Sequence, residues 1–403
     1  MKIRRVKLSD IAELTVGFVG NMAKQYKDEG VKFLRSLNIK PFSIVEDDLK
    51  YISREFNESL RKSILHENDL IIVRTGIPGT CCVVSKDYDG CNCADVVLVR
   101  PNLQVVNPHY LAAYINVWGK KQVEYNKVGA IQKHFNVKSA EEMLIDLPDL
   151  ESQNKVAKIL CDLNDKIISN EKINDYLEEM AKTIYDYWFV QFDFPDEDGK
   201  PYKSSGGKMV FCSELNQEIP QSWDYTSIGN ISICLDSERI PLSNQQRQEM
   251  KGFIPYYGAT GIVDYVNRPI FSGDYVLLAE DGSVMDDNGN PILQRVSGDV
   301  WVNNHTHVLQ PVKGYSCRLL YLLLKDIPVA MIKTGSIQMK INQANLNNYN
   351  ILNIPDLIRT NFIVQIEPID AQIIQIQKEN SNLTKIRDWL LPMLMNGQAT
   401  IED

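Results

Sequence analysis

Two nearly identical octets stand far apart in this chain, and they constrain its fold more than any other feature. The first is GAIQKHFN at 129–136, and the second is GSIQMKIN at 335–342, which begins 206 positions later. Each octet precedes a similar motif, LIDLPDL at 144–150 and ILNIPDL at 351–357. Matches that keep their order and nearly keep their offset are typical of an internal duplication. The sequence therefore predicts two related halves of about 200 residues each.

The segments before the octets follow the same order in both halves. DLIIVRTG at 69–76 and ADVVLVRP at 94–101 have the β-branched, apolar composition of strands, and 111–128 has the composition of a helix. The second half repeats this order with DYVLLAEDG, THVLQPV and RLLYLLLKD at 274–282, 306–312 and 318–326. This parallel predicts one α/β module that is built twice.

Each PDL motif opens a long amphipathic stretch. Apolar residues recur every three or four positions from Val156 to Trp188 and from Ile366 to Leu390, before the stop signals Pro392 and Gly397. Such a stripe most often packs on the core of its own domain, but both stretches are unusually long and follow the same motif. We therefore expect two long helices that pair antiparallel. The expected packing residues are Ile159, Leu163, Ile173, Leu177, Met180, Ile184, Ile373, Ile376, Leu383, Ile386 and Leu390.

The expected fold class is α+β, with two globular α/β domains separated by two long antiparallel helices in a pseudo-twofold repeat. The segment at 190–210 has the Pro, Gly, Ser and charge content of a linker. The expected boundaries are 1–150 for the first domain, 151–192 for the central helix, 193–357 for the linker and second domain, and 358–403 for the C-terminal helix.

The net charge of −9 argues against strong binding to a polyanion by the chain alone. The charge is unevenly distributed, because residues 1–140 hold 21 Lys and Arg against 15 Asp and Glu, and the remainder holds 22 against 37. The first domain could thus present a basic face. If the protein binds nucleic acid, we expect weak binding alone and reliance on partners.

The eight cysteines favour reduced, structural thiols over a metal site. Four of them, at 81–93, lack a C-x-x-C pair or a well-placed histidine, and adjacent Cys81 and Cys82 would face opposite sides of a strand. The N-terminus shows no secretory signal, and no apolar run is long enough to span a membrane. We therefore expect a cytoplasmic protein without a metal.

Catalytic motifs are scarce. NPHY at 107–110 is similar to the N-P-P-[YF] loop of amino-methyltransferases, but its third position differs and no glycine-rich cofactor loop precedes it, so a strand-to-helix turn is favoured. DDNGN at 286–290 lacks the spacing of a calcium loop and fits a turn better. No P-loop, G-x-S-x-G or H-E-x-x-H occurs. These absences favour a binding protein.

Several polar segments beside glycines suit recognition of a ligand such as DNA. Arg, Asn and Gln can read base edges with two hydrogen bonds, and glycine permits close approach of the backbone. For any single residue a turn or core role remains the more common alternative. The candidates for DNA binding are Arg35, Asn38, Arg74, Thr75, Gln132, Lys133, Asn136, Tyr256, Tyr257, Thr260, Asn303, His305, Gln338, Lys340 and Asn342.

The chain resembles the specificity (S) subunits of type I restriction–modification systems over essentially its whole length. The resemblance rests on the stretch at 153–189, FPDEDGKPYKSSGGKMV at 194–210, EIPQSW at 218–223, the two octets, IPYYGATGIVDYV at 254–266 and LLPMLMNGQ at 390–398. These motifs in this order are a specific signature.

The resemblance implies two target-recognition domains, each of which reads one half of a bipartite, asymmetric DNA site. The paired helices would set the length of the unread spacer and dock two modification (methyltransferase) subunits, and restriction subunits would join that core. It also implies a non-catalytic chain that binds no cofactor. S-adenosylmethionine (AdoMet) would bind to the methyltransferase subunits, and ATP and Mg to the restriction subunits.

Two other functions remain open on the residues alone. The chain could be the recognition part of an enzyme that fuses methyltransferase and nuclease activity, which predicts that it binds AdoMet. It could also be a coiled-coil interaction protein with no role in nucleic-acid binding, which predicts that it retards no DNA even with methyltransferase partners.

Overall fold

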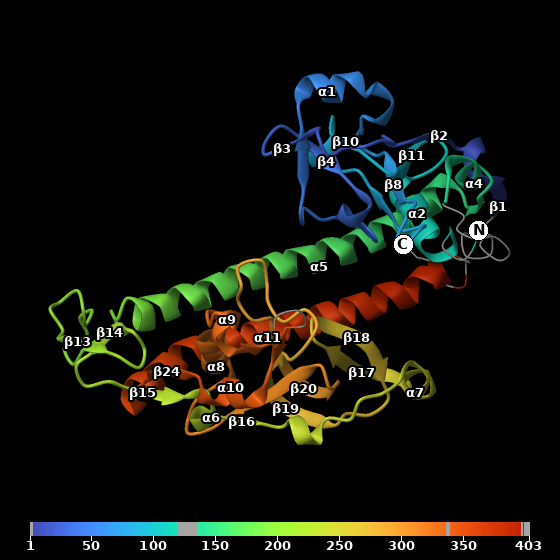
Figure 1. The fold of residues 1–403 in the computed structure, drawn as a ribbon. Helices are drawn as coiled ribbons and strands as arrows, with labels where there is room; N and C mark the ends of the chain where they lie inside the picture. The colour runs from blue at the N-terminus through green and yellow to red at the C-terminus, as the bar shows by residue number, and fades with distance from the viewer. Residues whose placement is uncertain (1–2, 120–121, 123–134, 336–338, 396–397, 399–403) are drawn as a thin grey trace. The chain divides into compact units, whose positions relative to one another are not determined.

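The computed structural model of the chain divides into two compact units (Figure 1). Unit 1 comprises Met1–Asn170 and Glu379–Asp403, and unit 2 comprises Glu171–Lys378. Two long helices, α5 (Leu150–Tyr185) and α11 (Asp356–Met395), each contribute residues to both units. The residues that the structure describes are 3–119, 122, 135–335, 339–395 and 398.

A four-stranded antiparallel sheet forms the centre of unit 1. Its strands, in spatial order, are β2 (Ala12–Val16), β11 (Val96–Pro101), β8 (Leu70–Val73) and β9 (Cys81–Val83). Successive residues of a strand face opposite sides of the sheet. Leu70 and Ile72 of β8 therefore enter the core with helix α2 (Pro108–Tyr114), whereas Ile71 and Val73 enter a second core on the other face. Because both faces are covered, β8 is a continuous apolar run.

Helix α2 begins at the NPHY motif. The Asn107 side-chain oxygen accepts hydrogen bonds from the backbone N–H groups of His109 and Tyr110 at 2.9 and 3.1 Å, and Pro108 occupies the first turn. An asparagine cap followed by proline is a common helix start. The interpretation of this motif as a strand-to-helix turn is confirmed.

Unit 2 is built around a six-stranded sheet. Its strands, in spatial order, are β16 (Ser232–Cys234), β21 (Thr306–Pro311), β19 (Phe271–Ala279), β20 (Leu293–Val302), β17 (Lys251–Gly258) and β18 (Gly261–Val266). Helix α8 (Cys317–Lys325) packs its leucines into the core of this unit together with Val276 and Leu278 of β19. The single parallel pairing in this sheet joins β17 to β20.

The two units repeat one connectivity, which confirms the internal duplication. The order β2-β11-β8-β9 in unit 1 corresponds to β16-β21-β19-β20 in unit 2. The strand that contains the first LIDL motif, β12 (Leu144–Leu147), pairs antiparallel with β1 (Arg4–Lys7). Its counterpart β24 (Asn350–Asn353) pairs antiparallel with β15 (Asp224–Ser227). A long helix follows β12 and β24 in turn, so each sequence repeat is one structural module.

Each unit also contains elements without a counterpart in the other. Unit 1 carries a small second sheet of β10 (Asn92–Cys93), β4 (Val31–Leu34), β7 (Lys50–Ile52) and β3 (Tyr26–Lys27), with helix α1 (Arg54–Ser59) beside it. Further short helices and strands are β5 (Ile39–Lys40), β6 (Ser43–Ile44), α4 (Val137–Glu141), β13 (Met209–Cys212), β14 (Gln217–Pro220), α6 (Ile228–Ile231), α7 (Asn244–Glu249), α9 (Val329–Ile332), β22 (Lys333–Thr334), β23 (Lys340–Ile341) and α10 (Gln343–Asn348). Of these, α4 and α10 correspond to each other, since each follows one of the two octets.

The long helices pair antiparallel within unit 1. Leu160 of α5 shares a core with Leu391 and Leu394 of α11. Further along α5, the buried side-chain amide of Asn170 donates to Glu379 Oε2 at 2.9 Å and to Asn380 Oδ1 at 2.8 Å. A later residue of α5 thus meets an earlier residue of α11, as the antiparallel prediction requires.

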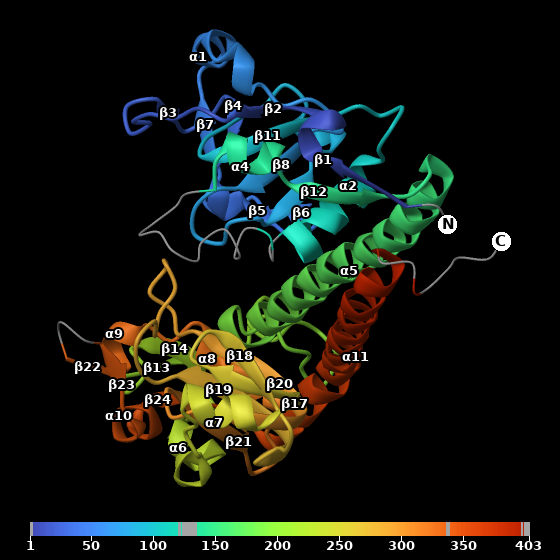
Figure 2. The ribbon, with the colours of Figure 1, turned by 90° about the vertical axis from the view of Figure 1, so that its right-hand side faces the viewer.

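The pairing has the same direction within unit 2 (Figure 2). Aromatic rings meet in this part of the contact. The ring of Phe362 on α11 lies 4.8 Å from that of Phe189 and 5.5 Å from that of Trp188, centroid to centroid. These two residues belong to a π-helical turn, Asp186–Val190, that directly continues α5. Edge-on aromatic contacts of this kind add to the stabilisation from buried area.

Three of the residues expected to pack between the helices are instead exposed: Ile173, Met180 and Ile386, at 38%, 51% and 46%. Asn170 and Ala181 of α5 are buried instead, although one is polar and the other is small. Met180 is next to Ala181 but faces outward, because each helical step turns the side chain by about 100°. The prediction that Ile173, Met180 and Ile386 pack between the helices is therefore wrong.

The remaining expected packing residues are at least partly covered. Ile373 and Ile376 are buried, Ile184 packs against the core of unit 2, and Leu390 packs against the core of unit 1. The others are half-buried: Ile159, Leu163, Leu177 and Leu383.

Candidate functional site

The two octets end in the same structural feature. The side-chain oxygen of Asn136 accepts from Ser139 N at 2.9 Å and starts α4. The side-chain oxygen of Asn342 accepts from Asn345 N at 2.8 Å and starts α10. The two asparagines therefore share a role as helix caps, which explains their repetition without a ligand. The candidates Gln132, Lys133 and Gln338 lie outside the described residues.

A cleft of about 580 Å³ in unit 1 contains two of the candidates, Arg35 and Thr75. Arg35 donates to the Asp48 carboxylate at 2.8 Å, and this pair belongs to a group that includes Lys50. The hydrogen bonds from Lys50 and Arg35 lower the pKa of the Asp48 carboxyl to about 2. The cleft wall also carries Ile77, which is 69% exposed. Polar groups and an exposed apolar side chain thus converge in one concave surface.

Arg74 lies next to this cleft with hydrogen-bonding capacity left over. Its Nε donates to the backbone oxygen of Phe135 at 3.2 Å, and its Nη1 lies 3.9 Å from the Asp95 carboxylate. Within the described part of the chain, Nη1 has no hydrogen-bond partner although it is buried. Such a donor is costly to leave unpaired.

Asn38, by contrast, is fully buried and structural. Its side chain accepts from Arg35 N at 3.0 Å and donates to the backbone oxygens of Val45 and Asp47 at 3.0 and 2.9 Å. These contacts use most of the hydrogen-bonding capacity of the amide. The prediction that Asn38 contacts DNA is wrong, because the side chain is sequestered in closing its own loop.

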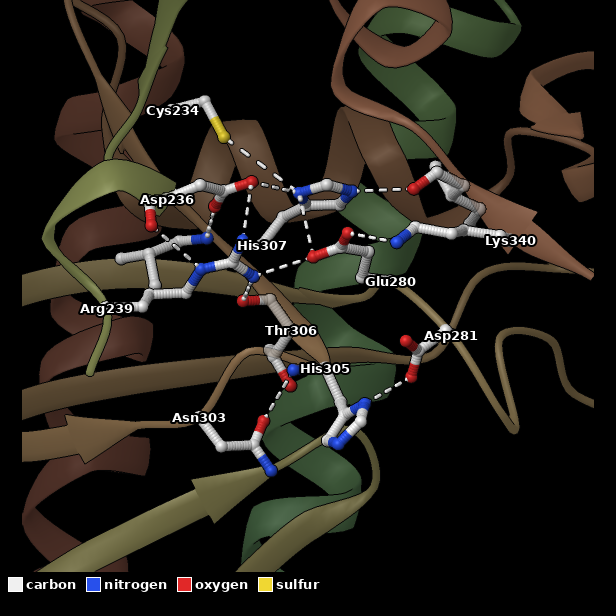
Figure 3. A network of polar contacts seen from close by, with 12 residues as sticks. Cys234, Asp236, Arg239, Glu280, Asp281, Asn303, His305, Thr306, His307 and Lys340 are labelled. Carbon is white, nitrogen blue, oxygen red and sulfur yellow. Dashed lines mark hydrogen bonds and ion pairs between the residues drawn. The ribbon is translucent and has the colours of Figure 1, made fainter. Parts of the chain in front are cut away.

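In unit 2 the site centres on His307, which is 1% exposed (Figure 3). Its Nδ1 lies 2.5 Å from Asp236 Oδ2, and its Nε2 lies 2.8 Å from the backbone oxygen of Ile341. Asp236 belongs to a 3-10 turn (Asp236–Glu238) that follows β16, and Ile341 belongs to β23, at the end of the second octet. One side chain of β21 thus joins two segments that are distant in sequence.

An ion-pair network surrounds this histidine. Arg239 donates to Glu280 Oε2 and to the backbone oxygen of Thr306, both at 2.7 Å. Lys340 Nζ lies 2.9 Å from Glu280 Oε1. The backbone N–H of Ile341 donates to the backbone oxygen of Glu280 at 2.9 Å, so both the backbone and the side chain of Glu280 hold β23. The network fixes the end of the second octet onto the sheet (Figure 3).

The electrostatics of the network favour ionised carboxylates. Burial on its own would raise the pKa of the Asp236 carboxyl, but the hydrogen bond and charge of His307, together with Arg239, lower it. Burial likewise opposes ionisation of Glu280, and hydrogen bonds from Lys340 and Arg239 with the charge of His307 lower its pKa. Both carboxylates are therefore charged at neutral pH and accept hydrogen bonds only.

The candidates on β17 separate into buried and accessible residues. Tyr256 is 2% exposed; its hydroxyl accepts from Leu242 N at 3.2 Å, and Arg247 lies over its ring. The prediction that Tyr256 binds DNA is therefore wrong, because the ring belongs to a small core under β17. Tyr257 is half-buried, and Thr260 is exposed in the turn between β17 and β18.

The candidates near His307 lie at one edge of its network. Asn303 is half-buried and accepts from the backbone N–H of His305 at 2.9 Å. His305 is exposed, and its Nδ1 lies 2.5 Å from the Asp281 carboxylate. Lys340 is also half-exposed at its ion pair with Glu280. The structure thus brings Asn303, His305 and Lys340 to one region (Figure 3).

The buried part of this network is not among the residues predicted from the sequence. His307 stands in the segment NNHTH, yet Asp236 and Glu280 come from turns 71 and 27 positions before it. No local pattern connects these three residues, since their proximity depends on the order of the strands. Because side chains alternate between the two faces of a strand, the sequence indicates only that His305 and His307 would lie on the same face of an extended segment.

The thiols of the first cysteine cluster are buried. Burial raises the pKa of the Cys93 thiol to about 12, and the thiols of Cys81 and Cys82 are also raised by burial. Among the described residues one group brings three potential metal ligands within 4.8 Å of one another, and it consists of Cys234, Asp236 and His307.

None of the helices in the described part combines the length and apolar character needed to cross a bilayer.

Exposed apolar side chains recur on the long helices. Ile173, Tyr176 and Met180 of α5 follow a spacing of three and four and are 38%, 69% and 51% exposed. On α11, Ile386 and Trp389 are 46% and 60% exposed. Both long helices therefore present exposed apolar side chains.

These features define a class of protein: a duplicated binding protein in which two related α/β units share an antiparallel helix pair. Comparison with known sequences agrees with this class. The chain belongs to the family described as the type I restriction modification DNA specificity domain, whose model matches residues 2–179 and 220–385. The prediction that the chain is similar to specificity subunits is confirmed.

Individual relatives extend the comparison. The MjaIX specificity subunit of Methanocaldococcus jannaschii is 29% identical over 281 residues, which are 65% of this chain and 62% of that protein. The alignment thus spans less than two thirds of that relative. The HindI specificity subunit of Haemophilus influenzae is 21% identical over 368 residues, 75% of this chain and 80% of the relative. The crystal structure of the S subunit from M. genitalium has the same fold, with a TM-score of 0.56 at 14% identity over 98% and 96% of the two chains.

Proposed function

We propose that this chain is the non-catalytic, DNA-reading subunit of a type I restriction–modification complex, and that each unit reads one half of a bipartite site. The observation that carries the proposal is the duplication: one module occurs twice, and the modules differ where they present polar side chains. Two dissimilar readers on one chain suit an asymmetric target. The first reader is the domain at 1–150 and the second the domain at 193–357, which the helices at 151–192 and 358–403 connect.

The cleft in unit 1 supports direct reading of bases. Arg35, Arg74 and Thr75 provide donors in or beside a concave surface, and the guanidinium of Arg74 has a donor without a described partner. Arginine is the residue most often used to read guanine in the major groove. On DNA binding, phosphate or base acceptors would replace the Asp48 and Asp95 carboxylates as partners of these arginines.

In unit 2 the corresponding surface consists of Asn303, His305 and Lys340, with Thr260 and Tyr257 of the β17–β18 hairpin as further contacts. Their side chains are exposed or half-buried, and they offer both donors and acceptors. The differences in residue type from the cleft of unit 1 support different half-sites.

The helix pair supports a spacer of fixed length between the half-sites. Two readers in successive major grooves need about 34 Å of separation, one turn of B-DNA. Hydrogen bonds from Asn170 to Glu379 and Asn380 set the register of the pair, because a buried polar contact penalises a shifted alignment.

Two methyltransferase subunits are the proposed partners of the helices, and restriction subunits complete the complex. The exposed apolar side chains on both long helices, among them Met180 and Ile386, support two copies of one partner. In this proposal the chain binds no cofactor: AdoMet belongs to the methyltransferase subunits, and ATP and Mg to the restriction subunits. Buried thiols support the reducing cytoplasm as the location.

The decisive experiment sequences methylated sites in a genome that expresses this chain with its methyltransferase partner. We expect a bipartite site with an unread spacer of fixed length. Exchange of residues 1–150 for the same domain of another specificity subunit should change one half of the site only. A change in both halves would refute the modular assignment. The Arg74→Ala variant should weaken discrimination in that same half.

A second measurement tests the alternative that the chain is itself part of an enzyme that binds AdoMet. Calorimetric titration of the isolated chain with AdoMet should show no binding, whereas the complex with methyltransferase subunits should bind it.

A third experiment tests the surface that docks the partner. Met180→Glu should reduce co-purification of the methyltransferase subunit. Lys172→Glu, at an exposed position on the same helix, serves as the matched control. Equal loss in both variants would remove the apolar stripe as the docking surface.

A further inference from the structure

We propose that Ile77 is a specificity-determining residue: at the tip of the β8–β9 loop, it reads the 5-methyl group of a thymine in the half-site of unit 1. This inference rests on the proposed function and deepens it, because it names one base of that half-site. The ligand of this part of the cleft is thus a 5-methylpyrimidine edge in a DNA groove.

The loop that carries Ile77 joins β8 to β9 and is closed by its own backbone. The backbone N–H of Val73 donates to the oxygen of Thr80 at 2.8 Å, and the Val73 oxygen accepts from Gly79 at 3.0 Å. Gly76 and Gly79 have φ angles of +81° and +88°, which glycine adopts without strain. The loop therefore holds Ile77 outward in a fixed conformation, and this residue is 69% exposed.

The surroundings of Ile77 distinguish it from an ordinary exposed apolar residue, which needs no function on a protein surface. It lines the unit 1 cleft together with Leu37, which is 44% exposed and comes from a separate 3-10 turn. The same cleft contains Arg35, Lys40 and Thr75, of which the last two are exposed. Apolar carbon and hydrogen-bond donors thus share one concave surface.

This combination matches the edge that thymine presents in the major groove. Thymine offers a methyl group there, at C5, beside the O4 acceptor. An aliphatic side chain gains free energy when it covers the methyl group, and Thr75 or Arg35 can donate to O4 or to acceptors of the neighbouring base pair. The minor-groove edge of thymine presents an acceptor and no methyl group. The cleft is therefore suited to a major-groove edge that includes a thymine.

Unit 2 shows that the module does not require an apolar residue at this position. Gly76 and Gly282 each stand three positions after the end of the corresponding strand, β8 or β19, and their φ angles are +81° and +78°. The next residue is Ile77 in unit 1 and Ser283 in unit 2, and both are exposed. The two residues before each glycine are Arg-Thr in unit 1 and Glu-Asp in unit 2. One backbone conformation thus carries different chemistry in the two units, as expected of a loop that determines specificity.

Insertion of Ile77 between base pairs is the main alternative for an apolar side chain at a DNA surface. Apolar wedges of minor-groove binders unstack a base step and kink the duplex. An inserted side chain contacts the faces of the bases, so its contribution does not depend on the thymine methyl group. Removal of that methyl group from the DNA therefore distinguishes the two modes.

The test uses the full chain in complex with its methyltransferase subunits and DNA duplexes that carry the site found by methylation sequencing. Exchange of residues 1–150 first identifies the half-site of unit 1. Each thymine of that half-site, on either strand, is then replaced in turn by deoxyuridine, which lacks the 5-methyl group and keeps the hydrogen-bonding groups. We expect the affinity to fall about fourfold at one position, as for the loss of one buried methyl group.

Variants of the chain assign this effect to Ile77. Ile77→Ala should bind the thymine and deoxyuridine duplexes with equal affinity, because its side chain no longer reaches the methyl group. Ile77→Val keeps a branched side chain and should retain most of the difference. Leu103→Ala is the matched control: it changes a 51% exposed apolar residue of unit 1 outside the lining of the cleft, and it should keep the full difference. Because both positions are exposed, the folded state should tolerate these changes.

Three results would overturn the inference. The first is the absence of any effect of deoxyuridine in this half-site, which includes the case of insertion between base pairs. The second is an equal effect of deoxyuridine in Ile77→Ala and in the parent chain, and the third is a unit 1 half-site without thymine. A complex that reads no bipartite site, or one in which exchange of residues 1–150 changes both halves, would instead contradict the proposed function.

Discussion

Replacement of the buried arginine of α8 tests how unit 2 holds its long helices. Arg318 is 0% exposed; its Nε donates to Asp370 Oδ1 of α11, and its Nη1 donates to Glu178 Oε2 of α5, both at 2.7 Å. Asp370 is itself 2% exposed and also accepts from Arg295 at 3.0 Å. The arginine thus connects one helix of the domain core to both long helices. We expect Arg318→Met to destabilise unit 2 substantially.

The magnitude follows from what the substitution leaves behind. Removal of one partner of a buried ion pair costs roughly 3 to 5 kcal/mol, because the other charge remains desolvated. Asp370 keeps its bond to Arg295, and Glu178 is partly exposed, so the lower end of that range applies. A loss of about 3 kcal/mol corresponds to a fall in Tm of about 6 to 12 °C for a domain of this size.

Chemical denaturation monitored by tryptophan fluorescence measures the effect in the full chain, where Trp188 and Trp223 report on the core of unit 2. Lys200→Met, which breaks an exposed ion pair with Asp198, is the control and should leave the unfolding midpoint unchanged. An Arg318→Met variant as stable as the parent would refute the argument. It would mean that the pairing of Asp370 with Arg295 alone satisfies the buried charge.

Three further predictions concern other parts of the fold. Asn136→Ala and Asn342→Ala should each reduce the free energy of unfolding by about 1 kcal/mol, because each removes a helix cap, and unequal losses in thermal unfolding would contradict their equivalence. Asn170→Ala should cost about 1 to 3 kcal/mol in the same assay, since it leaves Asn380 without a buried donor. Cys93, whose pKa burial raises to about 12, should resist alkylation by iodoacetamide at neutral pH until the chain unfolds, and rapid labelling of the native protein would disprove its burial.

The architecture was predictable because it follows from sequence features that repeat along the chain. The octets with their PDL motifs indicated two modules, and the period of the apolar residues indicated two long helices. The face of each helix was harder to predict. Asn170 and Ala181 are buried, and a rule that follows only large apolar residues passes over both. The apolar pattern instead selected Met180, whose side chain is exposed.

The candidate site was less predictable, since it depends on which loops the fold brings together. Asn38 and Tyr256 have residue types suited to recognition, yet their side chains are buried by local contacts that composition does not reveal. His307 is the opposite case: it stands beside a predicted candidate, and its partners arrive from β16 and β19. A single sequence contains the residues of such a network but not their proximity.

Unit 1 has one structural property that bears on how the protein is made. Its first 170 residues are completed by residues from Glu379 onwards, so this module can be completed only after about 200 further residues have been made. During synthesis the apolar side of α5 near Leu160 has no Leu391 to cover it. A premature stop before Glu379 would therefore damage unit 1 as well as unit 2, and chaperones would encounter the nascent chain with α5 still unpaired.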